Sequence, residues 1–251
     1  MVDGGLCSVD SPQLEPVAQD LHVHTVFSHG DGAIVPEQTV ELVAAVGHAR
    51  ILGISDHFEY VSGDRFAAYR DTVRVHGLAL GTEVQGVEWV DPAADAEVDY
   101  YVFHCEDTAA HYAGAQRLAA TGKPVIIAHP LLLHTNLDRV PPECLIEINN
   151  RYVWRGDWRA GYTPYVNRFR FVISSDAHQP HWLNQTVARW VARELGVEEF
   201  LLFLERTAAR KPCARLAGSE GNGMKGGTSH GTAGVSTGHV GYAGPVGRGG
   251  R

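Results

Sequence analysis

Three kinds of feature are scarce in this sequence of 251 residues, and each absence excludes a class of protein. The four cysteines, Cys7, Cys105, Cys144 and Cys213, form no Cys-x-x-Cys pair, which disfavours a zinc ribbon and a disulfide framework. No run of 18 apolar residues occurs, so we expect no transmembrane helix and no membrane partner. Residues 1–19 lack the apolar stretch of a signal peptide, and we therefore expect a cytoplasmic protein.

Positive charge is also scarce. The chain has 21 Lys and Arg against 29 Asp and Glu, which gives a formal net charge of −8, and only three of the basic residues are lysines. A negative total disfavours broad electrostatic capture of nucleic acid, so no stable nucleic-acid complex is expected. The sequence carries no signal for the oligomeric state.

Histidine and glycine, by contrast, are abundant, and glycine is concentrated at one end. Residues 217–251 hold 13 of the 28 glycines, and such a segment buries too little apolar area to offset its ordering entropy. We therefore predict a loosely ordered leader over residues 1–19, one folded domain over 20–210, and a Gly-rich disordered tail over 211–251.

Short apolar runs alternate with helical stretches inside the predicted domain. Each run has four to six residues rich in Val, Ile, Leu, Tyr or Phe, which is typical of buried parallel strands. Seven strands that alternate with helices predict an α/β fold with a parallel sheet, and closure into a barrel is its natural form. The predicted strands are Asp20–His24, Ile51–Ser55, Ala79–Val84, Asp99–His104, Pro124–His129, Leu145–Asn149 and Phe171–Ser175.

Helix signals lie between these strands. Residues Val197–Arg210 are predicted as a last helix, whereas Arg151–Arg168 has no helical period and is predicted as a long functional loop. The expected helix starts are Pro36, Asp64, Thr108 and Asn184, and the expected stops are Gly77, Gly122 and Gly196.

Six of the seven predicted strands end in residues that can bind metal ions. In a parallel barrel these ends meet at one mouth, where active sites form. Burying so many imidazoles and carboxylates together is costly unless cations neutralise them, and this donor set suits Zn, Fe or Mn. The residues concerned are His22, His24, Asp56, His57, Glu83, His104, His129, Asp176 and His178.

The order and spacing of these motifs resemble a known family. The segments DLHVHTVFSHGDG, GISDH, GTE, the single His104, IIAHP and SSDAH are similar to those of the polymerase and histidinol phosphatase (PHP) family of phosphoesterases. The resemblance covers about residues 20–205. It implies a distorted seven-stranded (β/α) TIM-like barrel with three divalent metal ions, whose identity among Zn, Mn and Fe the ligand set leaves open.

The resemblance also implies a role for each ligand. His22, His24 and Asp176 would hold one ion, which Glu83 would bridge to a second ion. The remaining ligands would be His104 and His129 on the second ion and His29, His57 and His178 on the third, with Asp31 as the alternative to His29. Among these, Glu83, Asp176 and His178 are the predicted catalytic residues. Asp56 is predicted to lie behind His57 and to hold its tautomer.

Arginine is the usual side chain for bidentate contacts with phosphate, and Arg151 and Arg155 in the predicted loop are the candidate substrate ligands. The expected reaction is hydrolysis of a phosphomonoester by a metal-activated hydroxide, with a metabolite like histidinol phosphate, a nucleotide or a short oligonucleotide as substrate. An amidohydrolase-type metallohydrolase and a non-catalytic metal-binding domain are the alternatives. Many amidohydrolases use a carbamylated lysine at a strand end, and Lys123 precedes its predicted strand instead.

Overall fold

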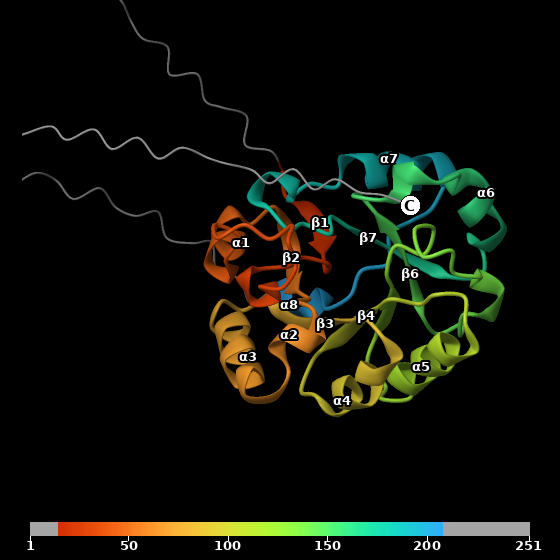
Figure 1. The fold of residues 1–251 in the computed structure, drawn as a ribbon. Coiled ribbons are helices and arrows are strands. Elements are labelled where there is room, and N and C mark those ends of the chain that lie inside the picture. Colours follow the sequence, from red (N-terminus) through yellow and green to blue (C-terminus); the bar gives the residue numbers. More distant parts are fainter. Residues whose placement is uncertain (1–14, 208–251) are drawn as a thin grey trace, which may run out of the picture. The chain divides into compact units, whose positions relative to one another are not determined.

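The computed structural model describes residues 15–207, and they form an α/β barrel of the TIM-like type. Its seven strands are hydrogen-bonded in chain order, and all six neighbouring pairs are parallel (Figure 1). The fold class predicted from the alternating pattern is thereby confirmed. The strands are β1 (Val17–Asp20), β2 (Ala49–Ile54), β3 (Ala79–Val84), β4 (Tyr100–Phe103), β5 (Val125–Ile127), β6 (Leu145–Asn149) and β7 (Arg170–Ser174).

The ring closes between the segments that follow β1 and β7. Val23 and Ala177 form an isolated parallel bridge, the amide of His24 donates to the carbonyl of Ala177, and the amide of Asp176 donates to the carbonyl of His22, each at 2.9 Å. These residues form the seam of the barrel. The predicted strand Asp20–His24 is therefore shifted, because β1 ends at Asp20 and the next residues pair only at the seam.

Helices connect the strands and cover the outside of the ring. Thr39 caps α1 by accepting a hydrogen bond from the amide of Leu42, and Thr108 caps α5 through the amide of His111. The predicted stop at Gly196 is a left-handed cap of α7 with φ 66°. The α-helices are α1 (Val40–Val46), α2 (Phe58–Val61), α3 (Phe66–Val75), α4 (Val90–Asp95), α5 (Ala109–Ala119), α6 (Trp158–Tyr162), α7 (Thr186–Leu195) and α8 (Leu204–Thr207). In the part of the chain that the structure describes, none of them is long and apolar enough to cross a membrane.

Alternating residues of each strand face the inside and the outside of the barrel, which gives two apolar layers. The outer layer packs strands against helices and holds Cys105 and Cys144, both buried. The inner layer contains Leu21, Ile51, Ala79, Tyr100, Val102, Ile126, Ala128, Leu145 and Val172.

Tyr100 fills the centre of the inner layer, and two glycines leave room for its ring. A Cβ on Gly53 or on Gly81 would lie 2.3 Å from a Tyr100 side-chain atom, well inside contact distance. The Tyr100 hydroxyl donates to the carbonyl of Leu21 at 2.8 Å, so the buried ring is also fixed by a hydrogen bond.

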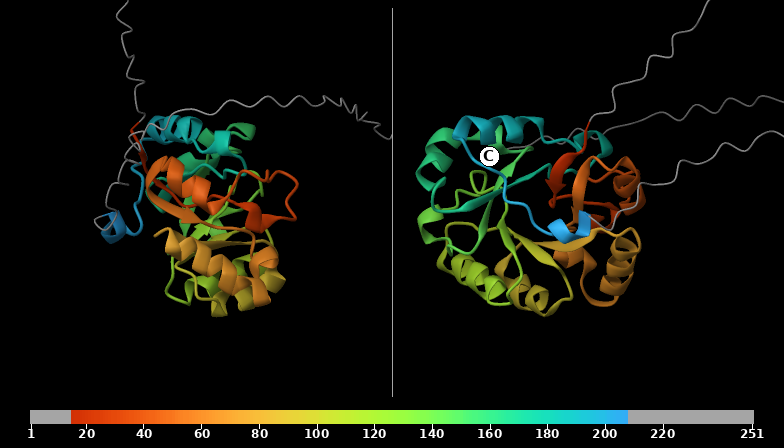
Figure 2. Two further views of the ribbon diagram at one scale, coloured as in Figure 1. Left: turned by 90° about the vertical axis from the view of Figure 1, so that its left-hand side faces the viewer. Right: turned by 180° about the vertical axis from the view of Figure 1, so that it is seen from behind.

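The segment after α7 closes the end of the barrel opposite the strands' carboxyl ends. Phe200, Leu202 and Phe203 pack against the inner layer, and Gln19 bonds the backbone of Phe200 and Leu202 with its amide group. In Figure 2 this blue segment runs across the back of the ring. The predicted helix Val197–Arg210 was wrong, because these inward contacts hold the chain in an irregular conformation. Within the described residues of this segment, up to 207, only α8 is helical.

Two further predictions need correction. The predicted loop Arg151–Arg168 contains the short helix α6, which Asp157 caps through the amide of Ala160. Part of the predicted leader, 1–19, is strand β1, while residues 1–14 and the predicted tail, 211–251, lie outside the described residues.

Candidate metal centre

Most of the histidines and carboxylates predicted from the strand ends line one pocket at the carboxyl ends of the strands, whereas His22, His24 and Asp56 are fully buried and do not line it. The pocket has a volume of about 390 Å³. Its walls combine histidine and carboxylate side chains with an apolar edge from Leu132 and Leu133. The ionisable residues that line it are Asp31, His57, Glu59, Tyr60, Glu83, His104, Glu106, His129, Arg151, Tyr152, Asp176 and His178.

Glu83 lies at the centre of the cluster. It is the inward-facing residue near the end of β3, and only 1% of its surface is exposed. Its Oε1 lies 2.7 Å from Nε2 of His104, 3.2 Å from Nε2 of His22 and 3.6 Å from Nε2 of His129. One carboxylate oxygen therefore faces three imidazoles, each from a segment that follows a different strand.

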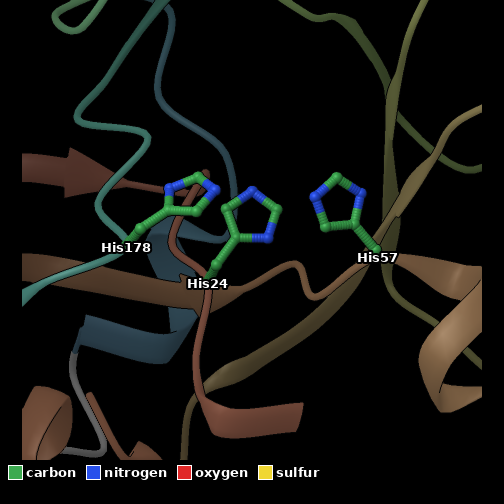
Figure 3. Close-up of side chains that lie close together, drawn as sticks. All are labelled: His24, His57 and His178. Atoms are coloured by element: carbon green, nitrogen blue, oxygen red, sulfur yellow. The ribbon is translucent and has the colours of Figure 1, made fainter. Parts of the chain in front are cut away.

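The second oxygen of Glu83 faces the other half of the cluster. Oε2 lies 3.2 Å from Nε2 of His24 and 3.2 Å from Nδ1 of His57. The rings of His24, His57 and His178 lie side by side, with centroids 4.6 Å apart for His24–His57 and 4.2 Å apart for His24–His178 (Figure 3). Glu83 is thus positioned to bridge two neighbouring ligand sets.

Three groups of ligand atoms within the described residues are compact enough to hold a metal ion, with all atoms of a group within 4.8 Å of one another. The second group, Glu83 with His104 and His129, has the composition that the resemblance implies. The first group contains His22, His24 and the bridging Glu83, as the resemblance implies, but not Asp176, and the third contains His24 where the resemblance implies His29. The groups are His22, His24 and Glu83; Glu83, His104 and His129; and His24, His57 and His178.

Asp176 lies at the edge of the first group. Its Oδ1 is 3.8 Å from Nε2 of His22, 3.7 Å from Nε2 of His24 and 3.3 Å from Nδ1 of His178. Its backbone has φ 56°, and His129 also has a positive φ of 26°. Left-handed backbone is strained for such residues and clusters at functional sites, so the surrounding structure must hold both in place.

The structure does not bring His29 to the cluster. Its ring is exposed and contacts Arg65 and the ring of Tyr60. Asp31 takes the predicted position, since its Oδ2 lies 2.8 Å from Nε2 of His178 and 3.6 Å from Nε2 of His57. The reason is local: residues 26–28 form a 3-10 turn, after which the chain turns Asp31, not His29, toward the pocket.

Asp56 acts on a different neighbour from the one predicted. Its carboxylate accepts hydrogen bonds from the amide and hydroxyl of Thr25, both at 2.7 Å, and from the hydroxyl of Ser28 at 2.6 Å. Oγ of Ser28 lies 3.4 Å from Nδ1 of His24 and accepts the backbone amide of His57. Asp56 therefore holds the loop after His24 and orients His24 through Ser28. Burial raises the pKa of Asp56 to about 6, although these hydrogen bonds oppose the rise.

Sequence reasoning missed Glu147 and Asn149 on β6. Glu147 is fully buried, with Oε1 2.7 Å from Nδ1 of His22, and Nδ2 of Asn149 is 3.2 Å from Oδ2 of Asp176. The sequence of this strand, LIEIN, contains a signal for them. Its two isoleucines alternate with Leu145, Glu147 and Asn149, so the two polar residues face inward together with Leu145.

Of the two candidate arginines, only Arg151 reaches the cluster. Its Nη1 lies 3.1 Å from Nδ1 of His178 and 3.5 Å from Oδ1 of Asp176, and its guanidinium carbon lies over the rings of Tyr152 and Trp182, 4.9 Å from each centroid. Arg155 is exposed and lies over the outer side of Tyr152.

The charges of the cluster perturb each other strongly. Burial would raise the pKa of Glu83, but His104, His22, His57 and His24 hold it well below its usual value. Burial lowers the pKa of histidine, yet nearby carboxylates, Glu83 first, raise the pKa of His57 to about 9. Burial together with His178 instead holds the pKa of His24 well below its usual value.

These residues fit a metal site by the chemistry of their donors. Nε2 of His22 and Nε2 of His24 lie 3.0 Å apart, close to the roughly 3 Å expected for two nitrogens each about 2.0–2.1 Å from one ion. Nδ1 of His57 and Nδ1 of His129 are buried and make no hydrogen bond. Because a ligating imidazole must be neutral, a cation bound at His57, whose pKa is raised, would displace a proton from that ring.

Comparisons with known proteins identify no family for this chain. No protein-family model matches it, and no curated protein matches it. Among solved structures, a truncated form of 3-deoxy-D-arabino-heptulosonate 7-phosphate synthase from Thermotoga maritima is similar over 72% of both chains, with 10% identity and a TM-score of 0.43.

Proposed function

We propose that this protein is a metal-dependent phosphoesterase of the PHP kind, which hydrolyses a phosphomonoester. The observation that carries the proposal is the set of five buried or nearly buried histidines around the Glu83 carboxylate, with Asp176, His178 and Arg151 beside it. A pocket of about 390 Å³ suits a small phosphorylated substrate or the end of a short oligonucleotide.

The residues of the pocket would have two roles, metal binding and phosphate binding, according to their position. The histidines, Glu83 and Asp176 would hold up to three divalent ions, with Asp31 completing the third set beside His57 and His178. Bound ions of this kind supply Lewis-acid activation of water and neutralise phosphate charge. Arg151 would bind a phosphate oxygen, since its guanidinium lies next to His178 and packs against the rings of Tyr152 and Trp182.

The test is hydrolysis of a generic aryl phosphate by chelated protein, before and after addition of Mn²⁺, Zn²⁺ or Fe²⁺. We expect turnover only with metal, and its loss in Glu83→Gln. Arg151→Ala should lower kcat/KM for the phosphate ester, whereas Arg155→Ala is the matched control, because it removes an arginine from the same loop that also lies over Tyr152 but outside the pocket.

Two outcomes would contradict the proposal. Hydrolysis of amides or lactones alone would favour an amidohydrolase-type enzyme. Lys123 speaks against the carbamylated version of that class: it is the one lysine of the described residues, and its Nζ donates to the carbonyl of Ala96, before β5 begins. Tight metal binding without any turnover would favour a non-catalytic domain.

A further inference from the structure

Strand β6 contributes no residue to the three metal-binding groups, yet it carries two buried polar side chains at their level. Glu147 and Asn149 alternate with Ile146 and Ile148, which belong to the outer apolar layer. Glu147 is paired in register with Val172 of β7, whose side chain belongs to the inner layer. A charged residue at such a position is costly unless every polar atom is bonded.

The Glu147 carboxylate has three hydrogen-bond partners, and two of them are N–H groups that can only donate. Oε1 lies 2.7 Å from Nδ1 of His22, and Oε2 accepts the backbone amide of His129 at 2.6 Å and Nδ2 of Asn149 at 3.0 Å. An ionised carboxylate only accepts hydrogen bonds, so His22 must carry its proton on Nδ1.

The orientation of Asn149 is fixed by its other contacts. Its Oδ1 accepts the backbone amides of Arg151 at 2.9 Å and Tyr152 at 3.1 Å, which leaves its NH₂ group to donate to Glu147 and to Asp176. The side chains of β6 thus touch the ligand His22, the ligand Asp176 and the turn that carries Arg151.

We infer that Glu147 is a positioning residue: it holds the proton of His22 on Nδ1 and thereby presents the bare Nε2 to the metal site. Nε2 of His22 points at Oε1 of Glu83 and at Nε2 of His24, 3.2 Å and 3.0 Å away. A carboxylate behind a ligating histidine both fixes its tautomer and increases its basicity, and it is usually worth 10–100-fold in metal affinity. The inference rests on the metal binding of the proposed function, not on its phosphoesterase reaction.

The decisive variant is Glu147→Gln, which keeps the shape of the side chain. Its amide has one acceptor oxygen and one donor group, so it cannot accept from His22, His129 and Asn149 together. We expect the affinity for the ion that His22 would bind, measured by competition with a chromophoric chelator, to fall about 10–100-fold. The circular dichroism spectrum should stay unchanged.

The matched control is Ser174→Ala. Ser174 is fully buried on β7, pairs in register with Asn149, and its hydroxyl makes no hydrogen bond. This variant tests whether the loss of any buried polar group inside the barrel weakens metal binding. We expect its metal affinity to equal that of the unaltered protein.

A second measurement does not depend on the folding of a variant. In the unaltered protein loaded with zinc, ¹⁵N NMR of the imidazoles should show the His22 proton on Nδ1, in slow exchange with water. Coordination through Nδ1 with the proton on Nε2 would overturn the inference, as would an unchanged metal affinity in folded Glu147→Gln. If zinc binds as expected but no phosphate ester is hydrolysed, the phosphoesterase proposal fails and the role of Glu147 stands.

Discussion

Glu83 should matter to metal binding about twice as much as a ligand of a single ion. It belongs to two of the three compact ligand groups, whereas His104 belongs to one. Glu83→Gln keeps the shape of the side chain and removes its charge. The substitution should therefore weaken the binding of two ions. His104→Gln, directly after the neighbouring strand β4, should weaken the binding of one ion.

The magnitude follows from linkage between binding and folding. We take a loss of about 100-fold for each ion that loses a ligand, the upper end of the cost of losing a ligand's hydrogen-bonding partner. Each 100-fold loss removes about 2.7 kcal/mol of stabilisation at a fixed excess of metal. For a domain of this size, where about 1 kcal/mol shifts Tm by about 2–4 °C, Glu83→Gln should reduce the metal-induced rise in Tm by about 10–20 °C and His104→Gln by about half as much.

The assay is thermal unfolding of each protein with chelator and with saturating Zn²⁺, followed by near-ultraviolet circular dichroism. The difference between the two Tm values of one protein isolates the metal term, because it cancels the effect of the substitution on the metal-free fold. Equal losses in the two variants, or a full metal-induced rise in Glu83→Gln, would refute the bridging position of Glu83.

Three other perturbations test the structure. Gly81→Ala should lower the free energy of unfolding by about 1–3 kcal/mol in urea titrations of metal-free protein, because its Cβ would overlap the buried tyrosine ring of β4; an unchanged midpoint would contradict that packing. Asp31→Asn should reduce the number of zinc ions per chain, measured by elemental analysis, and His29→Asn should not; the reverse result would restore the sequence prediction. Burial raises the pKa of Cys105 and Cys144 to about 12, so both thiols stay protonated at pH 8.5 and their peptides should remain unalkylated by iodoacetamide until urea is added.

The fold was predictable because the strands are buried on both faces. The predicted bounds of two strands, Ala79–Val84 and Leu145–Asn149, are confirmed. Every residue of these two strands is buried. The first strand was predicted too far along the chain, at Asp20–His24, because the four residues of β1, VAQD, have no apolar run and owe their pairing to β2.

Tertiary contacts decided what local sequence left open. Residues after Val197 have good helix formers, but Phe200 and Leu202 cover the inner layer of the barrel, and Gln19 binds their backbone from β1. Such contacts span more than 180 residues of sequence, so no local pattern indicates them.

The candidate site was predictable wherever a ligand follows directly from a strand. His22, His24, His57, Glu83, His104, His129, Asp176 and His178 come together as expected, which leaves their metal binding to experiment. His29 and Asp31 could not be separated, because the orientation of both depends on one turn of 3-10 helix. Glu147 was missed because its contribution reaches the cluster only through another side chain.

The barrel seam has a consequence for how this protein would respond to loss of metal. His22 and Asp176 share one of the two backbone hydrogen bonds of the seam, and their side chains lie together at the first group of candidate ligands. A cation bound there would hold the two edges of the seam together. Removal of the ions should then loosen the seam before any helix unfolds. Amide hydrogen exchange should become faster first at residues 22–24 and 175–177.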